Sequence, residues 1–186
     1  MERQRIRDGR SGFSLLETLV AVLVLTIGVL GLAGLLANGL AFMGMSKYDY
    51  IAQQKAAEAV ESIFTARDMG QATWNTICNE ASAVCAAGIF VPGPVSLCAP
   101  GPDGILGTAD DDCTQPDSIL VPNSSGNFNP PVREALAGFT RTIVINTVTI
   151  NGSTVANLRQ ITVTINYTAG QFKRTYTLNT YISNFS

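Results

Sequence analysis

The sequence contains no histidine among its 186 residues. Histidine is the commonest general base in catalysis and the commonest metal-binding nitrogen, so Ser-His and Cys-His catalytic arrangements are excluded. Charged residues are also scarce. They make up 14% of the chain, against about 25% in an average soluble domain. The formal net charge of −2 provides no basic surface for nucleic-acid phosphates. The composition therefore predicts a protein that is not an enzyme and does not bind nucleic acid directly.

The cysteines lack the C-x-x-C spacing of common zinc sites, and without histidine such a site would need all four thiolates. The four residues are Cys78, Cys85, Cys98 and Cys113. An even number of cysteines after an apolar segment is typical of disulfides formed in an oxidising compartment, with free buried cysteines as the alternative. Three pairings are possible, and Cys78–Cys85 with Cys98–Cys113 is the most local of them.

Much of the charge deficit falls in one segment, because no charged residue lies between Thr18 and Ser46. Apolar residues and glycine dominate residues 13–46, and this run exceeds the roughly 20 residues that cross a bilayer as a helix. Residues 1–12 form a polar leader with four arginines and two acids, which we expect to be absent from the folded product. The sequence therefore predicts a leader followed by a membrane-embedded helix.

The helical pattern continues through residues 47–70, where the sequence becomes amphipathic. Five residues form one apolar stripe at helical spacing: Ala52, Ala56, Ala59, Val60 and Ile63. Gly70, which follows a basic residue in the last turn, is a typical helix stop. We expect one continuous helix of roughly 55 residues, and its apolar stripe requires a covering surface.

Residues 71–138 are rich in proline, glycine, aspartate and serine, and they contain all four cysteines. This composition predicts a variable loop region, which disulfides or a bound metal would have to hold together. A short helix around Ala72–Ala83 remains open. The single tryptophan, Trp74, is expected to pack beneath the disulfide region.

The last segment, residues 139–186, alternates apolar and polar residues as strands do, first in "RQITVTINYT". In "QFKRTYTLNTYI" the apolar face is predicted to hold Phe172, Tyr176, Leu178 and Ile182. In "TRTIVINTVTI" the apolar phase shifts between Ile145 and Val148, as at a β-bulge. Hairpin-turn signals follow at Asn151 and Ala169. Together these elements predict an α+β fold, in which the long N-terminal helix packs on a C-terminal antiparallel β-sheet.

The beginning of the apolar segment carries a recognisable motif. "GFSLLE", residues 12–17, follows a short basic leader and precedes the apolar helix, and it resembles the N-terminal signal of type IV pilins and pseudopilins. The resemblance implies a pilin-like fold, cleavage by a prepilin peptidase between Gly12 and Phe13, and N-methylation of Phe13. The continuation "LVLTIGVLGLAGL" is similar to minor pilins of the PilV type, the type IV pilus modification proteins. The close resemblance covers residues 10–42.

This resemblance implies a minor type IV pilin that joins the priming or tip complex and promotes pilus assembly or adhesion. Its partners would be the prepilin peptidase and methyltransferase, other minor pilins, the major pilin and the inner-membrane assembly platform. The C-terminal domain would face the periplasm before assembly and lie in the pilus at the cell surface afterwards. Gly34, roughly where major pilins commonly carry a proline, and the lack of any cysteine after Cys113 favour a minor component.

Two other functions remain open for the same segment. The first is a minor pseudopilin of a type II secretion or DNA-uptake system. The second is a membrane-anchored calcium-binding adhesin that does not polymerise. In a plain anchor, Glu17 would simply lie at the interface near the helix N-terminus, where the helix dipole favours an acid.

Glu17 is the one acid at the start of the apolar run. A carboxylate at mid-bilayer costs about 2.5–3.5 kcal/mol on insertion scales. After cleavage at Gly12, Glu17 would lie about one helical turn from the new amino group. In a filament of packed helices the carboxylate could pair with the terminal amine of a neighbouring subunit, in an apolar core where an unpaired charge is costly. The sequence thus predicts an assembly role for Glu17.

A second unusual stretch is "PDGILGTADDDC", residues 102–113. Calcium takes six to eight oxygen ligands from carboxylates, hydroxyls and carbonyls, and the stretch resembles calcium loops of extracellular bacterial proteins and, in kind, of major pseudopilins. The predicted ligands are Asp103, Thr108, Asp110 and Asp112. A solvated turn is the alternative.

Overall fold

A computed structural model of the chain describes residues 14–184. The chain divides into two compact units, with the boundary between Met43 and Gly44. One helix, α1 (Leu15–Asp68), runs through both units. It ends where Gly70 adopts a positive φ of 74° and donates its N–H to the Arg67 carbonyl at 2.9 Å, a conformation that glycine adopts without steric cost. The predicted continuous helix and its stop are confirmed.

The second unit is built around a four-stranded antiparallel sheet with the order β1-β6-β7-β8. Its strands are β1 (Val95–Ser96), β6 (Thr140–Ile150), β7 (Ser153–Ala169) and β8 (Phe172–Ser183). In the β6–β7 turn, Asn151 and Gly152 both have positive φ, 50° and 80°, as a two-residue hairpin of this type requires. The β6–β7 register shifts between Thr147 and Val148, so the predicted bulge is also confirmed.

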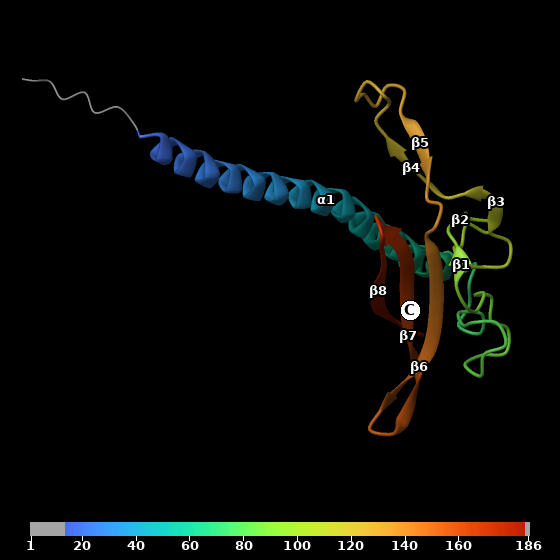
Figure 1. The fold of residues 1–186 in the computed structure, drawn as a ribbon. Coiled ribbons are helices and arrows are strands. Elements are labelled where there is room, and N and C mark those ends of the chain that lie inside the picture. The colour runs from blue at the N-terminus through green and yellow to red at the C-terminus, as the bar shows by residue number, and fades with distance from the viewer. Residues whose placement is uncertain (1–13, 185–186) are drawn as a thin grey trace, which may run out of the picture. The chain divides into compact units, whose positions relative to one another are not determined.

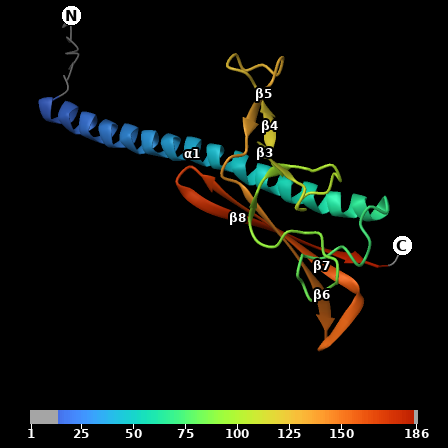
Figure 2. The ribbon, with the colours of Figure 1, turned by 90° about the vertical axis from the view of Figure 1, so that its right-hand side faces the viewer.

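The C-terminal half of α1 packs on one face of this sheet (Figure 1, Figure 2). Ala52, Ala56, Ala59 and Ile63 are completely buried, while Val60 is partly buried. Since three of these side chains are alanines, the helix backbone can approach the sheet closely. The facing sheet residues are mainly β-branched, and they include Ile143, Ile145, Ile161, Val163, Ile165 and Ile182. The sheet is the covering surface that the stripe requires, and the α+β prediction is confirmed.

One predicted core residue is not in the core. Phe172 is 64% exposed, whereas Tyr176 and Leu178 pack against the core and Ile182 is fully buried. Phe172 has the correct strand phase, but it is the first residue of β8 and follows directly after the turn at Gly170. Alternation predicts which side of a strand a residue faces and not whether the opposite layer extends that far.

The loop region contains two small hairpins that were not expected. They pair β2 (Cys98–Ala99) with β3 (Asp112–Pro116), and β4 (Ser118–Val121) with β5 (Val132–Ala135). The disulfides join Cys78 to Cys85 and Cys98 to Cys113. This is the most local of the three pairings that the sequence allows.

The short helix that the sequence left open around residues 72–83 is absent, because α1 is the sole helix within residues 14–184. The Thr76 hydroxyl accepts the Thr73 N–H at 2.9 Å and donates to the Thr73 carbonyl at 3.0 Å, and such local bonds compete with helix formation. Arg159 takes the carbonyls of Trp74 and Ile77 as acceptors, the latter at 2.7 Å. Both carbonyls accept hydrogen bonds from a side chain on β7, so they are not the acceptors of helical hydrogen bonds.

Two buried polar side chains attach the loop region to the sheet. The Asn79 amide accepts the Ile145 N–H at 2.9 Å and donates to the Ile143 carbonyl at 2.7 Å, so it serves as a pairing partner for the edge of β6. The Arg159 guanidinium lies 4.1 Å from the centroid of the Trp74 ring, a favourable cation–π arrangement. Trp74 also packs against the hydrophobic core, so it is a packing residue, as predicted.

Candidate functional site

The first turn of α1 carries the polar groups of the predicted assembly site. The Glu17 N–H bonds the Ser14 carbonyl at 3.0 Å and the Ser14 hydroxyl at 3.2 Å, so Ser14 caps the helix. The spacing from Ser14 to Glu17 is that of a capping box, a local signal that the sequence interpretation did not use. The Glu17 side chain is exposed in the first turn, where the helix dipole favours an acid. Gly12 and Phe13, the predicted processing junction, lie outside the described residues.

The rest of this unit presents an almost entirely apolar surface. The large apolar side chains described between Leu15 and Met43 are all more than half exposed. An 18-residue window of α1 reaches a mean hydropathy of 2.8, so the helix is long and apolar enough to cross a membrane. The hydroxyls of Thr18 and Thr26 donate to helix carbonyls three or four residues earlier, which satisfies them without water. This surface requires lipid or other helices around it.

Glycines interrupt the apolar surface at positions where no other side chain of the described residues comes close. An added Cβ would meet nothing within 4 Å at Gly28, Gly31, Gly34, Gly39 or Gly44. In water each glycine costs a helix up to about 1 kcal/mol relative to alanine. In membranes, small residues allow neighbouring helices to approach closely. The glycines thus leave space for contacts outside this chain.

The acidic loop of the second unit does not gather the predicted calcium ligands. Asp103 accepts the Ile105 N–H at 2.8 Å, and Asp110 accepts the Thr108 hydroxyl at 2.7 Å. The carboxylate of Asp112 accepts the N–H and the hydroxyl of Thr114. Each acid therefore closes its own short turn.

Within residues 14–184, no group of three or more His, Cys, Asp or Glu side chains is placed to hold a metal ion. Among the four predicted ligands, a direct contact joins Thr108 to Asp110. A calcium ion needs six to eight oxygens around one centre, which carboxylates, hydroxyls and carbonyls can supply. Calcium binding stays a prediction that chelation of the protein can test.

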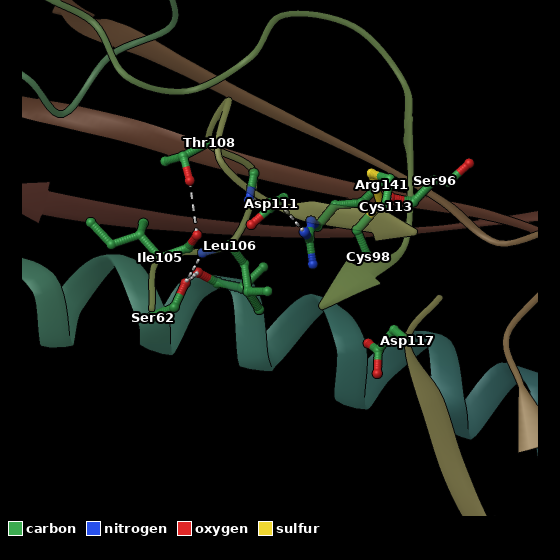
Figure 3. A network of polar contacts seen from close by, with 12 residues as sticks. Ser62, Ser96, Cys98, Ile105, Leu106, Thr108, Asp111, Cys113, Asp117 and Arg141 are labelled. Atoms are coloured by element: carbon green, nitrogen blue, oxygen red, sulfur yellow. Dashed lines mark hydrogen bonds and ion pairs between the residues drawn. A yellow bond between two sulfur atoms is a disulfide. The ribbon is translucent and has the colours of Figure 1, made fainter. Parts of the chain in front are cut away.

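A residue that the sequence interpretation missed lies beside this loop. Arg141 on β6 is completely buried, and its Nη2 lies 3.3 Å from Oδ2 of Asp111 (Figure 3). Burial lowers the pKa of Arg141, opposed by the Asp111 charge. Burial raises the pKa of Asp111, opposed by the Gly107 N–H and by Arg141. The sequence did contain an indication that Arg141 is buried. It lies two and four residues before Ile143 and Ile145, and therefore on the same inward face of β6.

A second polar cluster attaches α1 to the end of the sheet. Asp49 lies 2.5 Å from the Arg174 guanidinium and accepts the Tyr167 hydroxyl at 2.5 Å. These two donors lower the pKa of Asp49, Tyr167 having the larger effect, while burial opposes them. Burial, together with the charge of Asp49, raises the pKa of Tyr167 from 10.0 to about 12.

We expect this cluster to make stability depend on pH at both extremes. The pKa of Asp49 is lowered from 3.8, so its stabilising effect is present above that value and is lost as the pH falls further. The pKa of Tyr167 is raised to about 12, so its contribution is present below pH 10 and is lost as the pH rises toward 12. The melting temperatures of the wild-type chain and of the Asp49→Asn variant, both measured in detergent, should therefore become equal at very low and at very high pH. A constant difference, like that expected for the control Glu61→Gln, would contradict this.

The N-terminal segment also matches a known family. The prokaryotic N-terminal methylation motif matches residues 7–33, a span that includes the predicted junction, the capped first turn and Glu17. No curated protein and no solved structure matches the chain. The motif implies processing by prepilin peptidase and assembly with other pilins in a membrane system, and it suggests a structural rather than an enzymatic protein. The apolar helix fits an anchor in the inner membrane. Over residues 7–33 the chain is thus similar to type IV pilin-like prepilins, and the long helix and antiparallel sheet of the described residues form an α+β arrangement of the pilin-like kind.

Proposed function

We propose that this chain is a minor type IV pilin that enters the priming or tip complex and promotes pilus assembly or adhesion. The observation that carries the proposal is the methylation motif over residues 7–33, followed by an apolar helix surface that the chain leaves uncovered. Lipid can cover this surface while the unassembled protein is in the inner membrane. In the filament, the corresponding helices of other pilins take the place of lipid.

The charge of Glu17 favours transfer of the helix from the lipid bilayer to the filament. In lipid its carboxylate is costly, by about 2.5–3.5 kcal/mol at the bilayer centre. Once Phe13 has become the N-terminus, the amine of a neighbouring subunit can supply the opposite charge. The open positions at the five helix glycines support close packing of such neighbours. The acid therefore favours the assembled protein over the free one.

Processing between Gly12 and Phe13 provides the first test. Mass spectrometry of the protein from its native membrane should show the loss of residues 1–12 and one added methyl group on Phe13. We expect Gly12→Val to block the cleavage and Gly9→Val, a matched change in the same leader, to leave it intact. An unprocessed wild-type chain that begins at Met1 would instead support a membrane-anchored binding protein that does not polymerise.

Incorporation provides the second part of the test. Sheared pili should contain the processed chain at a low copy number relative to the main subunit, and deletion of the chain should reduce the number of pili. Processing without any pilus defect, combined with a defect in secretion or DNA uptake, would assign the protein to the pseudopilins.

A further inference from the structure

The acidic loop, residues 101–113, contains four aspartates and no basic residue. Like charges at short range oppose compact folding, and a nearby cation offsets this repulsion. The sequence pattern assigns that role to calcium. The structure places a different positive charge there, the buried guanidinium of Arg141 (Figure 3).

We propose that Arg141 is the structural cation of the acidic loop and makes the fold of this loop independent of calcium. Asp111, the acid outside the predicted ligand set, connects the guanidinium to the loop backbone. Its Oδ2 contacts Nη2 of Arg141 at 3.3 Å and accepts the Gly107 N–H at 2.7 Å. The exposed fractions of the two side chains, 0% for Arg141 and 7% for Asp111, show that solvent screens this pair very little.

The loop backbone is fitted closely to the strand that carries Arg141. Gly107 has a φ of +90°, and a Cβ there would lie 2.6 Å from Cδ1 of Ile143 on β6. A Cβ at Gly101 would lie 2.4 Å from the Asp110 carbonyl oxygen. The disulfide between Cys98 and Cys113 closes the loop at its base. Gly107 thus allows the loop to lie directly against β6, while the disulfide joins the two ends of the loop.

Arg141 also disfavours a calcium ion at the remaining oxygen of its partner. Oδ1 of Asp111 is buried and has no hydrogen-bond partner in the described structure, and the same holds for Nε and Nη1 of Arg141. A divalent cation bound at Oδ1 would lie close to a guanidinium that cannot lose its proton. At such short range in a poorly screened site, the repulsion between two positive charges is strong.

Two other acids whose charges act on Arg141, Asp117 and Glu58, share an ion pair with a lysine. Lys55 lies 2.7 Å from Asp117 and 2.8 Å from Glu58. Among the described residues, Asp111 is the acid that forms an ion pair with Arg141. Removal of Arg141 would therefore leave Asp111 as a buried carboxylate without a counter-charge, a costly state.

The wild-type protein gives the decisive test. The full chain in detergent is melted in excess chelator and in excess calcium, with the fluorescence of Trp74 as the signal. We expect the same melting temperature in both conditions and no heat of calcium binding by titration calorimetry. A melting temperature that falls in chelator and recovers with calcium would overturn the proposal, and this result does not depend on any variant.

Variants test the role of the guanidinium itself. Arg141→Met should lower the melting temperature far more than Arg133→Met, which removes an exposed arginine on β5. Addition of Asp111→Asn to Arg141→Met should recover part of the loss, because no buried charge then remains unpaired. Equal melting of the Arg141→Met and Arg133→Met variants would contradict the assignment. If Arg141→Met does not fold alone, recovery in the double variant still supports it, and absence of recovery counts against it.

Discussion

Glu17→Gln should leave processing intact and remove the protein from pili. The neutral amide no longer pairs with the terminal amine of a neighbouring subunit, while it inserts into lipid more easily than the acid does. A cost of about 2.5–3.5 kcal/mol for a mid-bilayer carboxylate corresponds to roughly a hundredfold change in an equilibrium. We therefore expect incorporation into sheared pili to fall by about two orders of magnitude. Quantitative immunoblots of pilus and membrane fractions measure this ratio.

Glutamine is chosen because it separates charge from helix capping. The capping box accepts glutamine as well as glutamate at the position of Glu17, so the cap from Ser14 can persist in the variant. Glu61→Gln removes an exposed acid further along the same helix, outside the apolar segment, and should assemble normally. Normal incorporation of Glu17→Gln would show that the charge of Glu17 is not required, which leaves helix capping as its possible role. In that case Ser14→Ala should reduce incorporation instead.

Asn79→Ala should lower the free energy of unfolding of the second unit by about 2–6 kcal/mol, because two buried groups lose their partner. The change leaves the Ile145 N–H and the Ile143 carbonyl without the partners that Asn79 supplies at 2.9 and 2.7 Å. A buried polar group left unpaired costs about 1–3 kcal/mol. Denaturant titration of the full chain in detergent, followed by Trp74 fluorescence, measures the effect. Trp74 is a suitable reporter because it is the single tryptophan and lies in the segment that Asn79 attaches.

Asn146→Ala is the matched control for Asn79→Ala. Asn146 lies on β6 next to Ile145 but is exposed, so its loss should change stability by less than about 0.5 kcal/mol. Asn79→Asp should also destabilise, because a carboxylate can accept the Ile145 N–H but cannot donate to the Ile143 carbonyl. Equal stability of Asn79→Ala and Asn146→Ala would show that the edge of β6 does not depend on Asn79.

The elements that the sequence predicted correctly are those specified by local patterns. The alanine stripe follows from helical spacing, the β6–β7 turn from Asn151 and Gly152, and the bulge from a phase shift within one strand. The methylation motif over residues 7–33 is equally local. Where a local pattern failed, as at Phe172, the missing information was the extent of the opposite layer.

The contacts that were missed join residues far apart in the chain. Asn79 bonds residues on β6, and Arg159 on β7 bonds the carbonyls of Trp74 and Ile77. Arg141 meets Asp111 across thirty positions. No periodicity connects such residues, and the hairpins β2–β3 and β4–β5 are too short to show alternation. The predicted ligand set omitted Asp111 because the pattern of acids does not reveal that a guanidinium lies beneath the loop.

The burial of the alanine stripe has a consequence for the order of events during biogenesis. Ala52, Ala56 and Ala59 are made early, but they share one core with Ile161 and Ile182, near the end of the chain. Contacts this distant in sequence form slowly, and only after the last strand is available. The apolar helix emerges first and can enter the membrane while the domain is still open. A chain truncated before β8 would therefore be anchored with an incomplete core that lacks Ile182, a target for quality-control proteases.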